Sequence, residues 1–228
     1  MHDAAEAHDN DQALKLKYQV LFLEYANSTG KRANWPYRFL EGTDMEDANF
    51  FKTYRNIKAL EQDIWGRFFD ETLSTLNAEP IYAEYTVREK LLAFSFTLIE
   101  VLKPYKGYVA DCCSGYFIQL LNRSFLKQFK QAFDNYSHTL LEEGKVNDEV
   151  AKRMLVSKQY DKVLWGQVLF VVHYWSHDSS EDDEQTDAAI EKSVNLTFDL
   201  LGRNAVDTAV DLTKFLIQKA TKNEPTTP

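Results

Sequence analysis

The sequence predicts an all-α protein, in which three short-to-medium helices at the N-terminus precede a larger body of long helices. Apolar residues recur at three- and four-residue spacing along most of the chain, which is the period of an amphipathic helix. The 228 residues include only 8 glycines and 5 prolines, few for an all-β protein with many tight turns. With 44% hydrophobic and 27% charged residues, the composition excludes a disordered chain, a collagen and a coiled-coil rod.

The N-terminal part of the chain divides into an acidic arm, three helices and a longer fourth helix. The first twelve residues are acidic and polar, and we expect them to be disordered. The apolar residues between Leu14 and Tyr25 have helical spacing, and Gly30 is suited to cap the end of that helix. Pro36 stands in the first turn of the next predicted helix, a position that proline often occupies. The predicted helices are 13–28, 34–40, 45–53 and 56–76.

Longer helices follow, and one of them is apolar on nearly every face. Residues 160–175 show this pattern, which predicts a central, buried helix. Residues 178–187 are strongly acidic and predict a solvated loop, and the final residues predict a disordered tail. The predicted helices of the body are 85–102, 116–143, 147–156, 160–175, 188–201 and 204–221.

Charge and cysteine content limit the cellular context. The formal net charge of −9 argues against general nucleic-acid binding, so any DNA contact must depend on a local excess of basic residues. Cys112 and Cys113 are the only cysteines and form no C-x-x-C motif, which predicts a reduced, cytoplasmic protein. No basic, apolar leader and no apolar run of about 18 residues is present, so we expect no signal peptide and no membrane span.

A tight turn at residues 41–44 joins two short helices, the arrangement of a helix-turn-helix. The second helix ends in aromatic residues, followed by a polar turn and a leucine on the next helix: Phe50, Phe51, Tyr54, Arg55, Asn56 and Leu60. With aromatic substitutions, this pattern resembles the recognition helix of the TetR/AcrR family of bacterial regulators. The order of the helices also agrees, so the resemblance spans residues 13 to about 222.

The resemblance implies a helix-turn-helix domain at 13–62 and a helical ligand-binding and dimerisation domain at 63–222. Its expected partners are double-stranded DNA, a small apolar ligand and a second copy of the chain. In the first domain, Asn49 would read a base edge, because an asparagine amide pairs well with adenine. The other DNA-binding candidates would hold phosphates: Arg38, Lys52, Thr53, Tyr54, Arg55 and Lys58.

The turn into the second helix departs from the family pattern. Asp44-Met45-Glu46 stands where family members usually carry Gly-Val-Ser or a close variant, and Asp47 adds a further carboxylate. Between residues 14 and 62, eight basic residues face six acidic ones, a small excess for a surface that must displace counterions. Two functions therefore stay open: a ligand-responsive, DNA-binding transcriptional regulator, or a TetR-fold protein that carries a lipid or quinone-like ligand without binding DNA.

In the larger domain, two groups of residues are candidates for function. An apolar ligand site between the helices would be lined by Phe94, Leu98, Phe117, Leu121, Phe125, Tyr160, Leu164, Gln167, Val168 and Val171, although each of these also suits a plain hydrophobic core. Two stripes on the last helices predict a four-helix dimer interface, with packing inside one chain as the alternative: Ile190, Val194, Phe198, Leu201, Val206, Ala209, Val210, Thr213, Leu216 and Ile217.

The residues that usually signal catalysis or metal binding do not form a recognisable motif. His173 and His177 have the spacing of a zinc pair but lack the glutamate of H-E-x-x-H. A nucleophilic Cys112 would need a neighbouring base, and the sequence indicates none. We expect no catalytic residue, no metal, no cofactor and no enzymatic activity.

Overall fold

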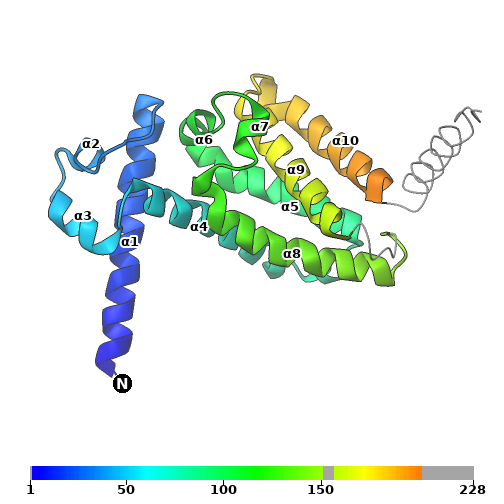
Figure 1. The fold of residues 1–228 in the computed structure, drawn as a ribbon, viewed down its shortest axis with the longest axis horizontal. Helices are drawn as coiled ribbons and strands as arrows, with labels where there is room; N and C mark the ends of the chain where they lie inside the picture. The colour runs from blue at the N-terminus through cyan, green and yellow to red at the C-terminus, as the bar shows by residue number, and fades with distance from the viewer. Residues whose placement is uncertain (1, 151–156, 202–228) are drawn as a thin grey trace, which may run out of the picture.

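The computed structural model describes residues 2–150 and 157–201, with side chains described at 9–150 and 160–201. All regular structure in these residues is helical. Figure 1 shows two parts: a head formed by α1 to α3 at one end, and a body formed by α5 to α10 at the other. Helix α4 begins in the head and continues into the body. The domain boundary expected at residues 62/63 thus falls inside one continuous helix.

The head consists of α1 (His2–Thr29), α2 (Tyr37–Leu40), α3 (Asp47–Thr53) and the start of α4 (Ile57–Ala78). The predicted helices 34–40, 45–53 and 56–76 match α2, α3 and α4 closely. Gly30 follows α1 with a φ of +67°, the left-handed conformation expected of a C-terminal cap.

The expectation of a disordered arm at residues 1–12 is wrong for the described part, because α1 already begins at His2. Acidic residues near a helix N-terminus interact favourably with the helix dipole. An ion pair of 2.8 Å between Asp11 and Lys15, one turn apart, adds to this effect. The acidic composition therefore suits the start of a helix as well as it suits a solvated arm.

The body contains α5 (Val87–Leu102), α6 (Lys106–Cys112), α7 (Phe117–Leu120), α8 (Lys127–Val146), α9 (Ser157–Ser176) and α10 (Glu184–Leu201). Short 3₁₀ helices occur at Pro80–Glu84, Lys103–Tyr105, Ser124–Leu126 and Glu181–Asp183. The prediction of a buried helix at 160–175 is confirmed, since α9 includes it and is largely buried. The helices predicted at 147–156 and 204–221 extend into, or lie within, residues outside the described part.

The predicted helix 116–143 is interrupted, in contrast to the single helix expected. The chain is extended at Arg123, and the bend places Phe125 and Leu126 in the core, where they are 5% and 1% exposed. Gly144 does not end α8, which continues to Val146. Instead, Gly144 is buried, and a Cβ there would lie 2.7 Å from Val150 Cγ2, so close packing explains the glycine.

The acidic segment 178–187 is only partly a loop, because α10 begins at Glu184, earlier than predicted. Asp178 organises the connection by accepting hydrogen bonds from the backbone N–H groups of Ser180 and Thr186, at 2.8 and 2.9 Å. The hydrogen bond from the Thr186 hydroxyl is the main reason that the pKa of Asp178 falls to about 2. The Asp178 carboxylate thus caps the start of α10.

None of the described helices is long and apolar enough to span a membrane.

Candidate functional site

The position of α3 depends on an aromatic cluster in the head. Phe50 is fully buried, and its ring meets those of Tyr18 and Phe39 edge-on at centroid distances of 5.3 and 5.9 Å. Such edge-to-face pairs stabilise a core beyond the area they bury. The rest of α3 therefore faces outward, with Asp47, Ala48, Asn49, Phe51 and Lys52 exposed.

Tyr54, predicted to hold a phosphate, is placed in the core of the head. It is 4% exposed, and its hydroxyl donates to Asp63 Oδ2 at 2.6 Å and accepts from Gln19 Nε2 at 3.1 Å. Burial, and then the hydrogen bond to Asp63, raise the pKa of Tyr54. The residue joins the end of α3 to α1 and α4 and does not face solvent. Its spacing of four from Phe50 could have indicated this, since both then share one helix face.

The other DNA-binding candidates lie on the surface or close to it. Arg38, Asn49, Lys52, Arg55 and Lys58 are exposed, and Thr53 is half-buried. Asn49 Oδ1 accepts a hydrogen bond of 2.9 Å from Lys52 Nζ, so the amide would have to exchange this partner for a base.

The end of α3 and the beginning of α4 place two basic side chains beside a helix N-terminus. Asn56 caps α4 by accepting a 2.9 Å hydrogen bond from the backbone N–H of Ala59. Arg55 and Lys58 flank this cap, and both are exposed. A helix N-terminus with cations beside it attracts phosphate groups, so this corner has the chemistry of a backbone contact.

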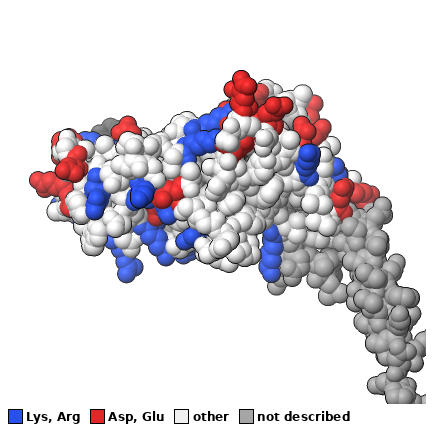
Figure 2. Space-filling view, turned by 90° about the horizontal axis from the view of Figure 1, so that it is seen from above, with Lys and Arg blue, Asp and Glu red and all other residues white. Residues whose placement is uncertain are grey.

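Acidic side chains surround the opposite end of α3. Glu41, Asp44, Glu46 and Asp47 are all exposed. Asp44 accepts a hydrogen bond of 2.9 Å from Lys17 of α1, and this contact holds the pKa of Asp44 below its ordinary value. Figure 2 shows red and blue side chains interspersed over the head, with red at its outer end. This face of the head is therefore mixed in charge.

A second set of contacts fixes the head to the body through the loop after α1. The Arg32 Nε and backbone N–H both donate to Asp111 Oδ2 of α6, at 2.6 and 3.1 Å, and Arg32 Nη1 donates to Glu61 of α4 at 3.1 Å. Burial raises the pKa of Glu61, while Arg32 lowers it in part. Asn27 adds hydrogen bonds of 2.7 Å to the Pro104 carbonyl and 3.1 Å from the Tyr108 N–H.

The predicted ligand residues mostly form the core of the body. Phe94 is typical: it is fully buried and stacks on Tyr136 at a centroid distance of 5.0 Å. Phe117 and Leu121 are half-buried. The others are at least nine-tenths buried: Leu98, Phe125, Tyr160, Leu164, Gln167, Val168 and Val171. Of these, Gln167 also borders a groove between α9 and α10. The sequence could not separate core from ligand site because both require apolar side chains on facing helices.

The predicted dimer residues on α10 also face inward. Ile190, Val194, Phe198 and Leu201 are 0 to 3% exposed, and α10 packs against α5 and α9. This placement agrees with packing inside one chain, the alternative reading of the stripe. The remaining candidates, Val206, Ala209, Val210, Thr213, Leu216 and Ile217, lie outside the described residues.

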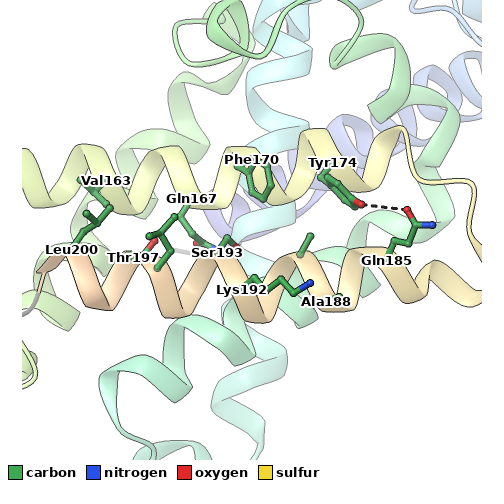
Figure 3. A pocket seen from close by; sticks show the side chains of 12 residues that line it. Val163, Gln167, Phe170, Tyr174, Gln185, Ala188, Lys192, Ser193, Thr197 and Leu200 are labelled. Carbon is green, nitrogen blue, oxygen red and sulfur yellow. Dashed lines mark hydrogen bonds between the residues drawn. The ribbon is translucent and has the colours of Figure 1, made fainter.

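The outer face of α9 and α10 carries an apolar groove with a volume of about 560 Å³. Figure 3 shows side chains from the two helices facing it, and the Tyr174 hydroxyl donates to Gln185 Oε1 at 3.4 Å at one end. Phe170, Leu196 and Leu200 line the groove and are 38%, 59% and 48% exposed, unusually high for large apolar side chains. Two small residues, Ala188 and Ala189, also line it.

The larger part of the chain is similar to a known protein family. A family described as "Tetracyclin repressor-like, C-terminal domain" matches residues 90–216, which is more than half of the chain. The matched region begins within α5 and includes all of α6 to α10, while the head precedes it. No curated protein and no solved structure matches the chain.

Proposed function

Because the chain belongs to the tetracyclin repressor-like family, we propose that it is a ligand-responsive transcriptional regulator that binds DNA through its head as a homodimer. The observation that carries this proposal is the presentation of α3. One face of that helix is anchored by Phe50 and the following Tyr54, and the other face is exposed. A short helix held in this way can enter the major groove.

In this function the exposed residues divide between two tasks. Asn49 reads a base edge after Lys52 releases its amide and turns to a phosphate. Arg38, Arg55 and Lys58 hold the backbone, with the N-terminus of α4 adding its dipole. Tyr54 supports α3 from inside and takes no part in phosphate binding.

The groove on α9 and α10 is proposed as the dimer surface, covered by a second copy of the chain. Its exposed Phe170, Leu196 and Leu200 lie on two adjacent helices, so two copies would bury the same patch against itself. Two heads are also what a regulator needs to read two half-sites of an operator. The partner is thus the same patch of an identical chain.

Fluorescence anisotropy of labelled duplex DNA, at about 50 and 200 mM salt, tests the DNA-binding part. The duplexes are the upstream region of the gene itself and a scrambled control. Selective binding that weakens with salt is expected, and Lys52→Gln with Arg55→Gln should lower the affinity and reduce the salt slope by about 2. Lys103→Gln with Lys145→Gln, two cations on the body, is the matched control.

A charge reversal at the start of α3 tests whether the acidic side chains there weaken DNA binding or have no effect on it. Glu46→Lys with Asp47→Lys should strengthen non-specific DNA affinity and steepen its salt dependence, because both carboxylates are exposed beside the proposed interface. Absence of binding before and after this change contradicts the regulator.

The acidic residues around α3 favour a second candidate, a TetR-fold protein that carries an apolar ligand and does not bind DNA. The groove of about 560 Å³ is large enough for such a ligand. Absence of DNA binding at the lower salt, together with an apolar molecule extracted from the purified protein and identified by mass spectrometry, would support this function instead.

Sedimentation or light scattering tests the dimer. The wild-type chain should show twice its 26.5 kDa mass, and Leu196→Glu with Leu200→Glu should return it to the monomer. Ile118→Glu on α7, also an exposed apolar residue, is the control and should leave the dimer intact. A monomeric wild type excludes the proposed interface.

A further inference from the structure

A second cavity lies where α4 leaves the head and meets the body. It has a volume of about 270 Å³ and is bordered by the first turns of α4, the bend at residues 121–126, the start of α8 and one residue of α9. Its cationic and apolar lining residues include Lys58, Leu121, Arg123, Lys127, Lys130 and Trp165. Leu121, one of the predicted ligand residues, lines this cavity.

The charged side chains that line the cavity are all basic. Four cations and no carboxylate border the cavity. Lys130 is neutralised by Asp134, with a shortest N–O distance of 2.6 Å, whereas Lys58 and Lys127 form no ion pair with any described residue. A site with this excess of cations attracts an anion and is incompletely compensated without one.

Arg123 brings guanidinium donors to this cavity. Its Nε is buried and has no hydrogen-bond acceptor in the described structure, while Nη2 makes one long contact of 3.4 Å with Gln119 Oε1. A buried guanidinium N–H without an acceptor is costly. A phosphate or carboxylate oxygen would satisfy it, because guanidinium and these anions match in geometry.

The inner wall of the cavity is apolar and held in place. Trp165 is 4% exposed, and its Nε1 donates to the Leu121 carbonyl at 3.3 Å. Gln62 Nε2 donates to the Ser124 carbonyl at 2.7 Å, which joins α4 to the bend. The cavity therefore offers a fixed aromatic and aliphatic wall beside its cations, as sites for small organic anions do.

We propose that this cavity binds a small organic anion, with a phosphate or carboxylate group on Arg123 and Lys127 and a short apolar or aromatic body against Trp165 and Leu121. A DNA backbone would use the cations but would leave the apolar wall unused. The ligand contacts α4 and α8 together, and α4 carries the head. The anion therefore acts as an effector that changes DNA affinity, and this effector role rests on the proposed function, whereas the binding does not.

The test is an NMR titration of the full-length protein, followed through the indole N–H resonance of Trp165 and assigned with Trp165→Phe. The probes are phenyl phosphate, inorganic phosphate and phenol. Phenyl phosphate should shift the resonance saturably, inorganic phosphate should bind more weakly, and phenol should not bind. Arg123→Gln with Lys127→Gln should weaken phenyl phosphate about tenfold or more, and Lys103→Gln with Lys145→Gln should not.

If the double variant fails to fold, Lys127→Gln alone serves, because Lys127 is exposed and makes no described ion pair. An unshifted Trp165 resonance with phenyl phosphate overturns the proposal, and so does equal binding by phenol or by the double variant. Displacement of phenyl phosphate by duplex DNA, with loss of DNA affinity in the double variant, would assign the cations to DNA and also overturn it.

Failure of the proposed function has a different signature. In that case duplex DNA does not bind the wild type, while the Trp165 titration still saturates. Where both bind, phenyl phosphate at saturation should change the DNA dissociation constant by at least about fivefold. An unchanged DNA dissociation constant rejects the effector role but does not contradict anion binding in the cavity.

Discussion

The head and the body of this protein reach stability in different ways. In the head, α2 has 4 residues and α3 has 7, too short to be stable alone, so their placement depends on a few aromatic rings. In the body, α8 and α9 have 20 residues each and bury continuous apolar faces. The comparison indicates that α2 and α3 can unfold locally, while the body is stabilised by many redundant contacts.

The largest expected effect comes from removing one buried ring in each part. Phe50→Ala in the head and Phe133→Ala in the body should each cost about 3–5 kcal/mol, because both rings are fully buried. Hydrogen exchange should show that Phe50→Ala exposes α2 and α3 while α8 stays protected, whereas Phe133→Ala lowers protection throughout the body. Equal loss of protection in α8 in both variants would show that the two parts unfold together.

Breaking the connection between the two parts should have the next largest effect. Arg32→Gln leaves Asp111 and Glu61 without their cation. Because both ion pairs are only partly exposed, we expect the free energy of unfolding to fall by about 2–3 kcal/mol. Chemical denaturation measures the loss, with Lys103→Gln, at an exposed ion pair, as the control. A loss no greater than that of the control would mean that the junction is held by packing alone.

Tyr54→Phe tests whether this residue is structural or binds DNA. The change leaves Asp63 and Gln19 with fewer partners in a part-buried site and should cost about 1–2 kcal/mol. The salt slope of DNA binding should not change, since the hydroxyl faces inward. Tyr37→Phe, at a half-exposed ring, is the control, and a reduced slope in Tyr54→Phe would restore the phosphate role.

The smallest expected effect concerns a helix cap in the body. Thr86 and Glu89 form a reciprocal capping box at the start of α5. Thr86→Ala should lower stability by about 1 kcal/mol, measured by thermal denaturation, without changing the head. Thr139→Ala on the exposed face of α8 is the matched control. If Thr86→Ala lowers the protection of the head amides from hydrogen exchange, α5 supports the head more directly than its contacts indicate.

Local pattern predicted several elements well. Gly30 ended α1 as expected because its left-handed conformation is a local property of the backbone. The apolar residues of α9 predicted a buried helix because helical periodicity is independent of partners. The bend at Arg123 was missed because its apolar neighbours, Phe125 and Leu126, continue the helical spacing and are turned inward only by packing.

The sequence by itself determined the all-α class, the order of the helices and the short helices of the head, because periodicity, caps and turns act within a few residues. Tertiary structure decided which way each face points. Tyr54 and Ile190 became core residues because neighbouring helices cover them, while Leu196 and Leu200 were left exposed along the α9–α10 groove. Only packing between distant segments brought Lys58, Arg123 and Trp165 to one cavity, since no local pattern links residues so far apart in the chain.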